Sequence, residues 1–136
     1  SQVGALHDKR IAVLGLAFKP ETDDVRESPG VRISKLLLQR GADVVLHDPM
    51  VQVDAVRDQL GGGITQAHDV AAAASGADAI VIATGWDAYR QLDWDDIATR
   101  MRSPIVFDGR QVMSTGHHHE GTTLLAPGRR PEGIGA

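Results

Sequence analysis

The chain has 136 residues, which suits one domain large enough to bury most of the surface that its unfolded form would expose. Hydrophobic residues make up 42% and charged residues 24%, and the formal net charge is −4, so the chain lacks the basic balance that nucleic acid binding requires. It contains no cysteine, which excludes disulfides, thiolate nucleophiles and cysteine metal ligands from this chain.

Residues 1–9 are polar and show no hydrophobic period, so we expect a linker or boundary segment that precedes the fold. They also lack the apolar stretch of a signal peptide, and no apolar run in the chain reaches the roughly 18 residues of a membrane span. We therefore expect a cytoplasmic protein without a membrane partner.

The first predicted strand runs from Ile11 to Phe18, a nearly continuous apolar stretch typical of a parallel strand covered on both faces. The charged loop after it carries Lys19 and Arg26, two cations that can hold phosphate or carboxylate oxygens. Ligands of parallel sheets bind at the carboxyl ends of strands, where this loop lies. On charge alone, a solvated loop is the simpler interpretation.

Ser28 and Pro29 supply an N-cap and a first-turn proline, which predicts that a helix follows the loop. Beyond it, strands are predicted at residues 42–46, 64–67, 77–83 and 104–107, and helices at 31–39, 51–60, 70–75 and 93–102. This alternation predicts an α/β fold, a Rossmann-like, three-layer, doubly wound and mostly parallel sheet of five to six strands with helices on both faces.

Two residues that follow predicted strands have alternative interpretations. Asp48 can bond a ribose hydroxyl, as the acid of a dinucleotide fold does, or close its strand with an Asx turn. The turn is favoured because the next glycine after Gly15 is Gly30, so the closely spaced glycines of a dinucleotide fingerprint are absent. Trp86 is either one wall of a ligand cleft or a plug of the sheet edge. Every aromatic residue is a candidate wall: Phe18, Trp86, Tyr89, Trp94 and Phe107.

Arg110 follows the strand predicted at 104–107, and by position it can face the same cleft as Lys19. Residues 114–136 lose the helical period and contain many glycines and prolines, so we expect an irregular segment. The pattern does not decide whether a last strand forms within it. The histidines at 117–119 are adjacent and do not converge on one ion, so no metal site is predicted.

Five motifs occur in the order found in the UDP-glucose/GDP-mannose dehydrogenase family: GLAFKPETDDVRESP at 15–29, HDP at 47–49, ATGW at 83–86, VFDGR at 106–110 and GIG at 133–135. The chain resembles the C-terminal domain of that family, which binds the nucleotide sugar. The resemblance implies that residues 10–113 are the UDP-sugar-binding domain of an NAD-dependent nucleotide-sugar 6-dehydrogenase. Such enzymes oxidise the sugar C6 alcohol to a carboxylate, as in UDP-glucose to UDP-glucuronate.

The same resemblance implies roles for individual residues. Phe18, Lys19 and Arg110 match substrate-binding residues, and Arg26 matches an arginine that reaches the NAD. The family binds that NAD mainly on an N-terminal domain, which would be a partner of this chain together with a dimer region in a homo-oligomer. The catalytic cysteine of the family also lies outside this chain, so no catalytic residue is assigned here and the chain alone is expected to be inactive.

Two other functions remain open from the residues alone. The chain can be a stand-alone Rossmann-like module that binds NAD or another nucleotide, although the missing glycine fingerprint weakens this alternative. It can also be a structural oligomerisation module with its charged loop at an interface, because a fold does not by itself define a function.

Overall fold

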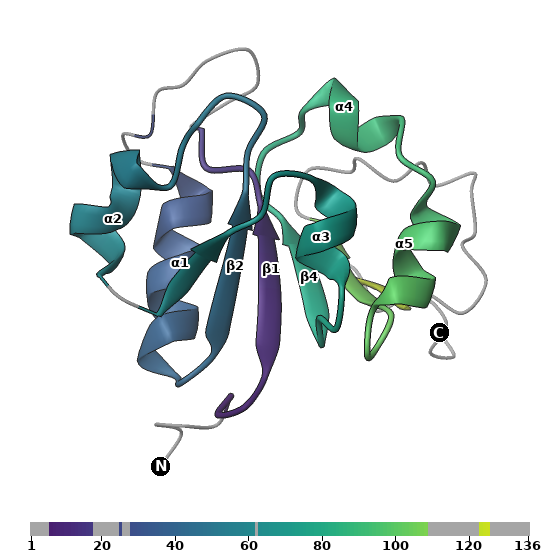
Figure 1. Ribbon diagram of the computed structural model, residues 1–136, viewed down its shortest axis with the longest axis horizontal. Coiled ribbons are helices and arrows are strands. Elements are labelled where there is room, and N and C mark those ends of the chain that lie inside the picture. Colours follow the sequence, from purple (N-terminus) through teal and green to yellow (C-terminus); the bar gives the residue numbers. More distant parts are fainter. Residues whose placement is uncertain (1–5, 18–24, 26–27, 62, 109–122, 126–136) are drawn as a thin grey trace.

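The computed structural model describes residues 6–17, 25, 28–61 and 63–108, and the backbone of 123–125. Strands and helices alternate along these residues (Figure 1). In chain order the elements are β1 (Arg10–Leu14), α1 (Pro29–Gln39), β2 (Asp43–His47), α2 (Asp54–Leu60), β3 (Ile64–Gln66), α3 (Val70–Ala74), β4 (Ala79–Ile82), α4 (Asp87–Arg90), α5 (Trp94–Arg100), β5 (Ile105–Asp108) and β6 (Thr123–Leu125).

The strands form one six-stranded sheet in the order β3-β2-β1-β4-β5-β6, and all five pairings between neighbours are parallel. This is the strand order of doubly wound Rossmann-like folds. The predicted fold class is therefore confirmed. β1 lies at the centre, between β2 and β4, and three of its five residues have no exposed surface, which explains its continuous apolar sequence.

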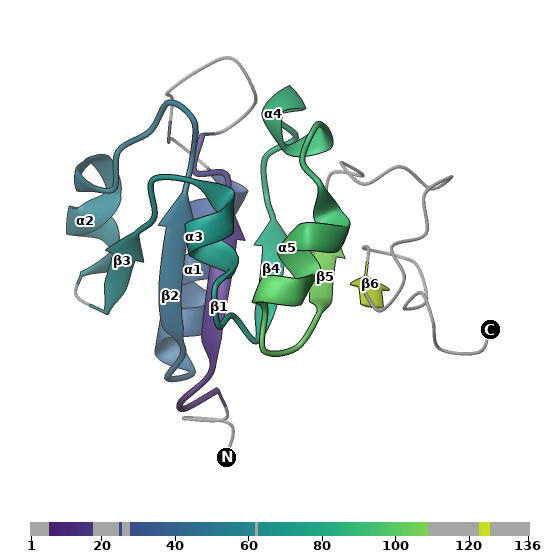
Figure 2. The same cartoon turned by 45° about the vertical axis from the view of Figure 1, so that its right-hand side comes forward.

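Helices cover both faces of the sheet. α1 contacts β1, β2 and α2, whereas α3 contacts β1, β2 and α5. In Figures 1 and 2, α1 lies behind the strands and α3 and α5 lie in front of them, so the three layers of the fold are visible in both views. Among the described residues, every helix is too short or too polar to span a lipid bilayer.

Three helices begin at polar N-cap residues, one of which is the predicted cap Ser28. Ser28 Oγ accepts a hydrogen bond of 3.3 Å from the N–H of Val31, and Pro29 occupies the first turn of α1. Asp69 and Asp93 cap α3 and α5 in the same way, by accepting from the N–H group three residues further along the chain. Each cap satisfies one of the backbone donors that a helix start leaves without a partner.

β1 is shorter than predicted, because it ends at Leu14 rather than at Phe18. Gly15 has a φ of +106°, a conformation that favours glycine, and its N–H donates to the carbonyl of His47 at 2.7 Å. The chain therefore turns across the end of β2 at Gly15, although the apolar sequence continues beyond it.

Two further elements differ from the sequence prediction or extend it. α4 is a single helical turn that the sequence pattern did not indicate, and its N-cap residue makes no side-chain capping bond. β6 lies in residues 114–136, for which the sequence pattern did not decide whether a last strand forms. It pairs with β5 in parallel.

The start of α1 lies directly against the end of β1. A Cβ atom added to Gly30 would contact the carbonyl oxygen of Gly15, and one added to Gly15 would lie 2.5 Å from the Cβ of Thr84. Both glycines are therefore required by close packing of backbone, which brings α1 onto the central strands.

Candidate functional site

The carboxyl ends of four neighbouring strands lie in register. Leu14 of β1 is opposite His47 of β2 and Ile82 of β4, and Ile82 is in turn opposite Asp108 of β5. Adjacent strands are about 4.8 Å apart, so the ends of β1 and β5, which flank β4, are about 10 Å apart. These four strand ends lie along one side of the sheet, which we call the carboxyl edge (Figure 2).

The predicted site residues belong to segments that start at this edge. Phe18, Lys19 and Arg26 follow β1 along the chain, and Arg110 follows β5. All four lie outside the described residues, so their roles stay predictions. The histidines at 117–119 do too, and within the described residues no three metal-ligating side chains are grouped.

Asp48 connects three strand ends at the carboxyl edge. Its side chain is buried, with 8% of the residue surface exposed, and five N–H groups donate to it. Oδ2 accepts from the backbone of Leu16 at 2.7 Å and Ala17 at 2.9 Å and from Trp86 Nε1 at 3.2 Å, while Oδ1 accepts from the backbone of Met50 at 2.8 Å and Val51 at 2.9 Å. All partners are donors, which suits an ionised carboxylate.

These contacts decide between the two interpretations of Asp48. The bonds from Met50 and Val51 form the predicted turn that closes β2. The bonds from Leu16 and Ala17 also hold the chain that leaves β1. Both oxygens are therefore directed into the protein rather than toward a ribose.

Thr84, at the end of β4, holds the same piece of chain from the other side. Its Oγ1 donates to the carbonyl of Ala17 at 2.8 Å, and its side chain is buried. Ala17 thus donates its N–H to Asp48 and accepts at its carbonyl from Thr84. The backbone at Ala17 is fixed by two strand ends that are far from it in sequence.

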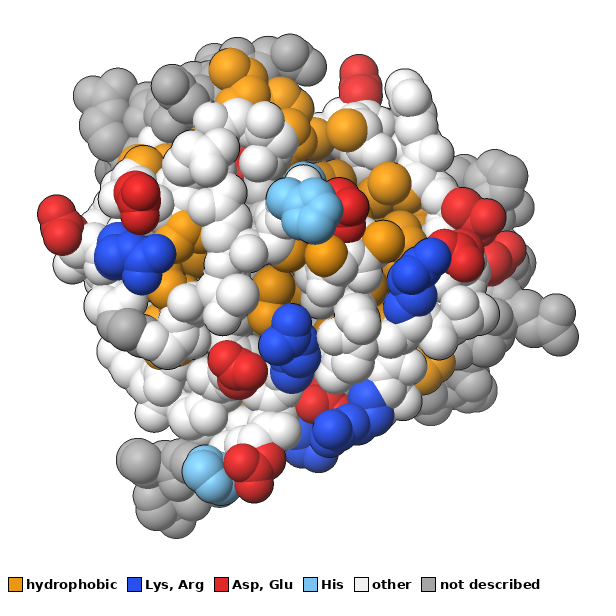
Figure 3. All heavy atoms as spheres, in the orientation of Figure 1, with side chains coloured by type: hydrophobic (Ala, Val, Ile, Leu, Met, Phe, Trp, Pro, Cys, Tyr) orange, Lys and Arg blue, Asp and Glu red, His pale blue; other side chains and the backbone are white. Residues whose placement is uncertain are grey.

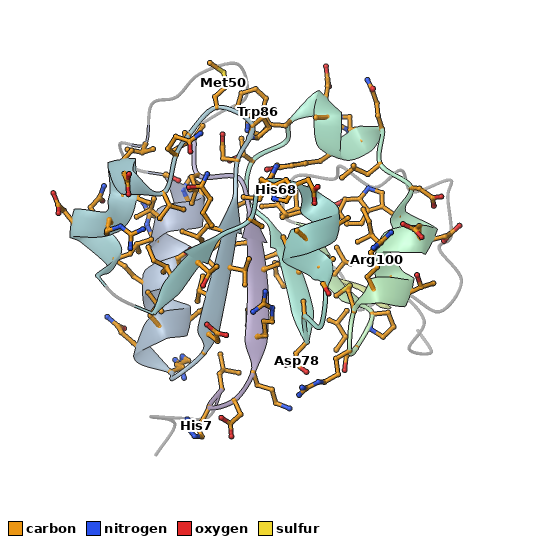
Figure 4. The ribbon with its side chains drawn as sticks, in the orientation of Figure 1. His7, Met50, His68, Asp78, Trp86 and Arg100 are labelled. Carbon is orange, nitrogen blue, oxygen red and sulfur yellow. The ribbon has the colours of Figure 1, made fainter. Side chains whose placement is uncertain are left out.

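Trp86 fills the carboxyl edge instead of forming an open wall. It is 5% exposed, and its indole N–H donates to Asp48. Figure 4 shows Trp86 and the half-exposed Met50 at the end of the molecule toward which β1 and β2 point. In Figure 3, hydrophobic atoms are visible at the same end and also in smaller patches over the rest of that face, between scattered acidic and basic side chains. Trp86 is therefore a plug of the sheet edge.

His47 and Tyr89 form a second polar cluster at the end of β2. Tyr89 Oη donates to the carbonyl of His47 at 3.2 Å and lies 3.0 Å from His47 Nδ1. Because the hydroxyl proton of Tyr89 is used in the bond to the His47 carbonyl, His47 Nδ1 is assigned as the donor in its contact with Tyr89 Oη. Trp94 Nε1 donates to the carbonyl of Tyr89 at 2.8 Å. Tyr89 and Trp94 are buried and so are not walls of an open site, contrary to the sequence prediction.

Burial lowers the pKa of His47, and this outweighs the opposite effect of the nearby carboxylates Asp48 and Asp69; the neighbouring His68 lowers it further. Burial also raises the pKa of Tyr89, so the phenol stays protonated. No sequence pattern predicts a role for His47, and the only signal of one is its place in the HDP motif at a strand end.

The lowered pKa of His47 predicts that the folded chain is less stable at acidic pH than at neutral pH. The unfolded chain binds a proton at this histidine near pH 6.5, whereas the folded chain binds it only at lower pH, so unfolding is favoured as the pH falls through 6.5. We expect a smaller free energy of unfolding at pH 5.5 than at pH 7.5, measured by urea denaturation. His47→Asn should weaken this dependence strongly, whereas His68→Asn should weaken it only slightly, because the neighbouring His68 is a minor cause of the lowered His47 pKa and burial is the main one. Equal pH profiles for wild type and His47→Asn would contradict the prediction.

The strand order, the parallel register and the loops at the carboxyl edge define a Rossmann-like ligand-binding domain. Residues 12–115 match the UDP binding domain of the UDP-glucose/GDP-mannose dehydrogenase family. The chain belongs to this family, as the motifs indicated, and corresponds to that domain.

Relatives with known functions or structures agree with this assignment. The chain is 40% identical over 129 residues to UDP-glucose 6-dehydrogenase of Rattus norvegicus. The aligned region covers 86% of this chain and 26% of the relative. It is similar to the solved structure of a UDP-glucose dehydrogenase from Pyrobaculum islandicum, with 43% identity and a TM-score of 0.66 over 78% of this chain and 23% of the other.

A second solved structure is similar over more of the chain. It is the NDP-N-acetyl-D-galactosaminuronic acid dehydrogenase from Methanosarcina mazei Go1, with 29% identity and a TM-score of 0.76 over 92% of this chain and 26% of the other. The chain thus spans about a quarter of the length of these relatives.

Proposed function

We propose that this chain binds the nucleotide part of a UDP-sugar within a longer NAD-dependent nucleotide-sugar 6-dehydrogenase of the UDP-glucose to UDP-glucuronate type. The main support is the alignment of strand ends in a domain of this family. Segments that follow β1 and β5 start about 10 Å apart at one edge, a distance that a nucleotide diphosphate can span. Residues 10–113 would form the binding domain, and 114–136 an irregular segment that includes β6.

Within this proposal, Phe18, Lys19 and Arg110 contact the UDP-sugar. Lys19 offers a compact cation to a phosphate or sugar oxygen, and Arg110 offers a planar guanidinium that can hold two oxygens at once. Arg26 would reach NAD bound mainly on the N-terminal domain of the whole protein. That domain, and a second copy in a homo-oligomer, are the proposed partners, and the cytoplasmic location stays a prediction.

The described residues do not fit a dinucleotide in the usual Rossmann mode. In that mode, backbone N–H groups of the first turn face the pyrophosphate, and the acid after the second strand bonds a ribose. Here Leu16 and Ala17 donate to Asp48 itself, and the carbonyl of Gly15 lies against Gly30. This arrangement disfavours the alternative of a stand-alone NAD-binding module and agrees with an NAD site on another domain.

The test is a titration of the chain with UDP, UDP-glucose, GDP-mannose and NAD, followed by amide NMR shifts. We expect the uridine ligands to shift the amides of Phe18, Lys19 and Arg110, with a Kd of roughly 0.1 to 1 mM because the remaining domains would complete the site. Shifts from NAD alone would favour the dinucleotide alternative. No shift from any nucleotide would contradict binding by this chain and favour a structural role.

Substitution of the proposed cations should weaken UDP binding. Lys19→Ala and Arg110→Lys should each lower the affinity about tenfold, because a hydrogen bond from a charged group contributes about 1.5 to 3 kcal/mol and lysine cannot replace the planar fork of arginine. Lys35→Ala on the exposed side of α1 and Arg102→Lys at the opposite end of the sheet are matched controls. An equal loss in Lys35→Ala would mean that the effect of Lys19→Ala is one of net charge, and an equal loss in Arg102→Lys would mean that the effect of Arg110→Lys is not specific to the proposed site.

The chain alone should not reduce NAD in the presence of UDP-glucose. The resemblance assigns the covalent step to a cysteine, and this chain contains none. The measurement is the absorbance of NADH with purified protein at high concentration. Turnover that stays proportional to the chain through successive purification steps would contradict the prediction.

A further inference from the structure

A buried clamp holds the chain just after β1. Asp48 accepts from the N–H groups of Leu16 and Ala17, and Thr84 donates to the carbonyl of Ala17. All four residues are at most 8% exposed. The clamp therefore joins the ends of β1, β2 and β4, and it acts on the backbone rather than on a side chain.

The clamp is chemically strong. Hydrogen bonds from N–H groups to a carboxylate are shorter and stronger than bonds between neutral groups, and the two backbone bonds here measure 2.7 and 2.9 Å. The remaining acceptor positions of Asp48 are used by Trp86, Met50 and Val51. The N–H groups of Leu16 and Ala17, in the turn that faces the pyrophosphate in a dinucleotide fold, are thus bonded to a carboxylate of the chain itself.

We propose that Asp48 and Thr84 are positioning residues for the UDP site. They fix the backbone at Leu16 and Ala17, and Phe18 and Lys19 are the next two residues of the chain. Neither residue needs to touch the ligand. This inference rests on the proposed function, because it concerns the affinity of the same site.

Asp78 provides a matched control for a purely structural role. It is also 8% exposed, and its Oδ2 accepts from the backbone N–H of Arg10 at 2.9 Å. It lies at the opposite end of the sheet, before β4, as Figure 4 shows. Its loss should lower stability without changing the carboxyl edge.

The experiment measures the Kd of UDP by calorimetry for the 136-residue chain, at a temperature where circular dichroism shows each variant folded. We expect Asp48→Asn and Thr84→Val to weaken UDP binding about tenfold, because small misplacements of a binding group are costly. Thr84→Ser keeps the hydroxyl and should restore affinity to within about twofold of wild type. Asp78→Asn should lose stability but keep its affinity.

Each outcome decides a different point. No binding by the wild type would overturn the proposed function, and the inference with it. Binding by the wild type that is unchanged in Asp48→Asn and Thr84→Val would overturn only the inference. A loss in Asp78→Asn equal to that in Asp48→Asn would also overturn it, because affinity would then follow stability. If Asp48→Asn does not fold, the comparison of Thr84→Val with Thr84→Ser decides.

Discussion

Gly30→Ala is expected to lower the free energy of unfolding by about 3 kcal/mol or more, the upper range for overpacking. Alanine would otherwise favour the helix by about 1 kcal/mol relative to glycine. The added methyl group meets the carbonyl oxygen of Gly15, a backbone atom at the end of the central strand. The contact can be relieved only by moving α1 away from β1. Urea denaturation of the variant and the wild type measures the loss.

Gly76→Ala separates the effect of close packing from that of backbone conformation. Gly76 has a φ of +70°, and a Cβ added there would meet no atom within 4 Å. Its substitution should cost only the conformational penalty of about 1 to 2 kcal/mol. If Gly30→Ala loses no more stability than Gly76→Ala, the packing of α1 on the end of β1 is looser than described.

Asp48→Ala is expected to lower the free energy of unfolding by about 3 kcal/mol or more, because each buried donor left without a partner costs about 1 to 3 kcal/mol. Leu16, Ala17 and Trp86 would each lose their acceptor in the protein interior. The substitution also leaves a small cavity lined by N–H groups. The loss is measured as a shift of the urea midpoint at neutral pH.

A small carboxylate added to the solution tests the cause of that loss. Formate can enter the cavity of Asp48→Ala and accept from the exposed donors, and a ligand that binds only the folded state stabilises it. We expect formate to restore part of the lost stability, and chloride at the same concentration not to. Asp78→Ala should lose less, because one backbone N–H bond depends on it. Near wild-type stability of Asp48→Ala would show that its bonds are weak.

The elements that the sequence predicted best are those set by local interactions. Ser28, Asp69 and Asp93 each cap a helix through an N–H group three residues away, so their role can be read from a short stretch of sequence. The alternation of apolar strands and amphipathic helices was similarly sufficient for the fold class. The turn formed by Asp48 with Met50 and Val51 belongs to the same group.

The features that the sequence did not predict depend on residues far apart in the chain. Asp48 bonds Leu16, 32 positions away, and Trp86, 38 positions away, and no local pattern signals either contact. The end of β1 was placed too late because apolar residues continue past Gly15, whereas its backbone turns there. Phe18, Lys19, Arg26 and Arg110 came from the family motifs, not from periodicity, and their roles await the titration.

The central position of β1 has a consequence for how the chain folds. β1 pairs with β2 and with β4, and the bond between Arg10 and Asp78 closes a separation of 68 positions. Contacts of such long range slow folding, because the entropy of loop closure is lost before the contacts form. During synthesis, β1 emerges before both of the strands that flank it, so it stays incompletely paired until β4 has been made. A nascent or truncated chain that lacks β4 would expose one edge of β1 and is expected to aggregate.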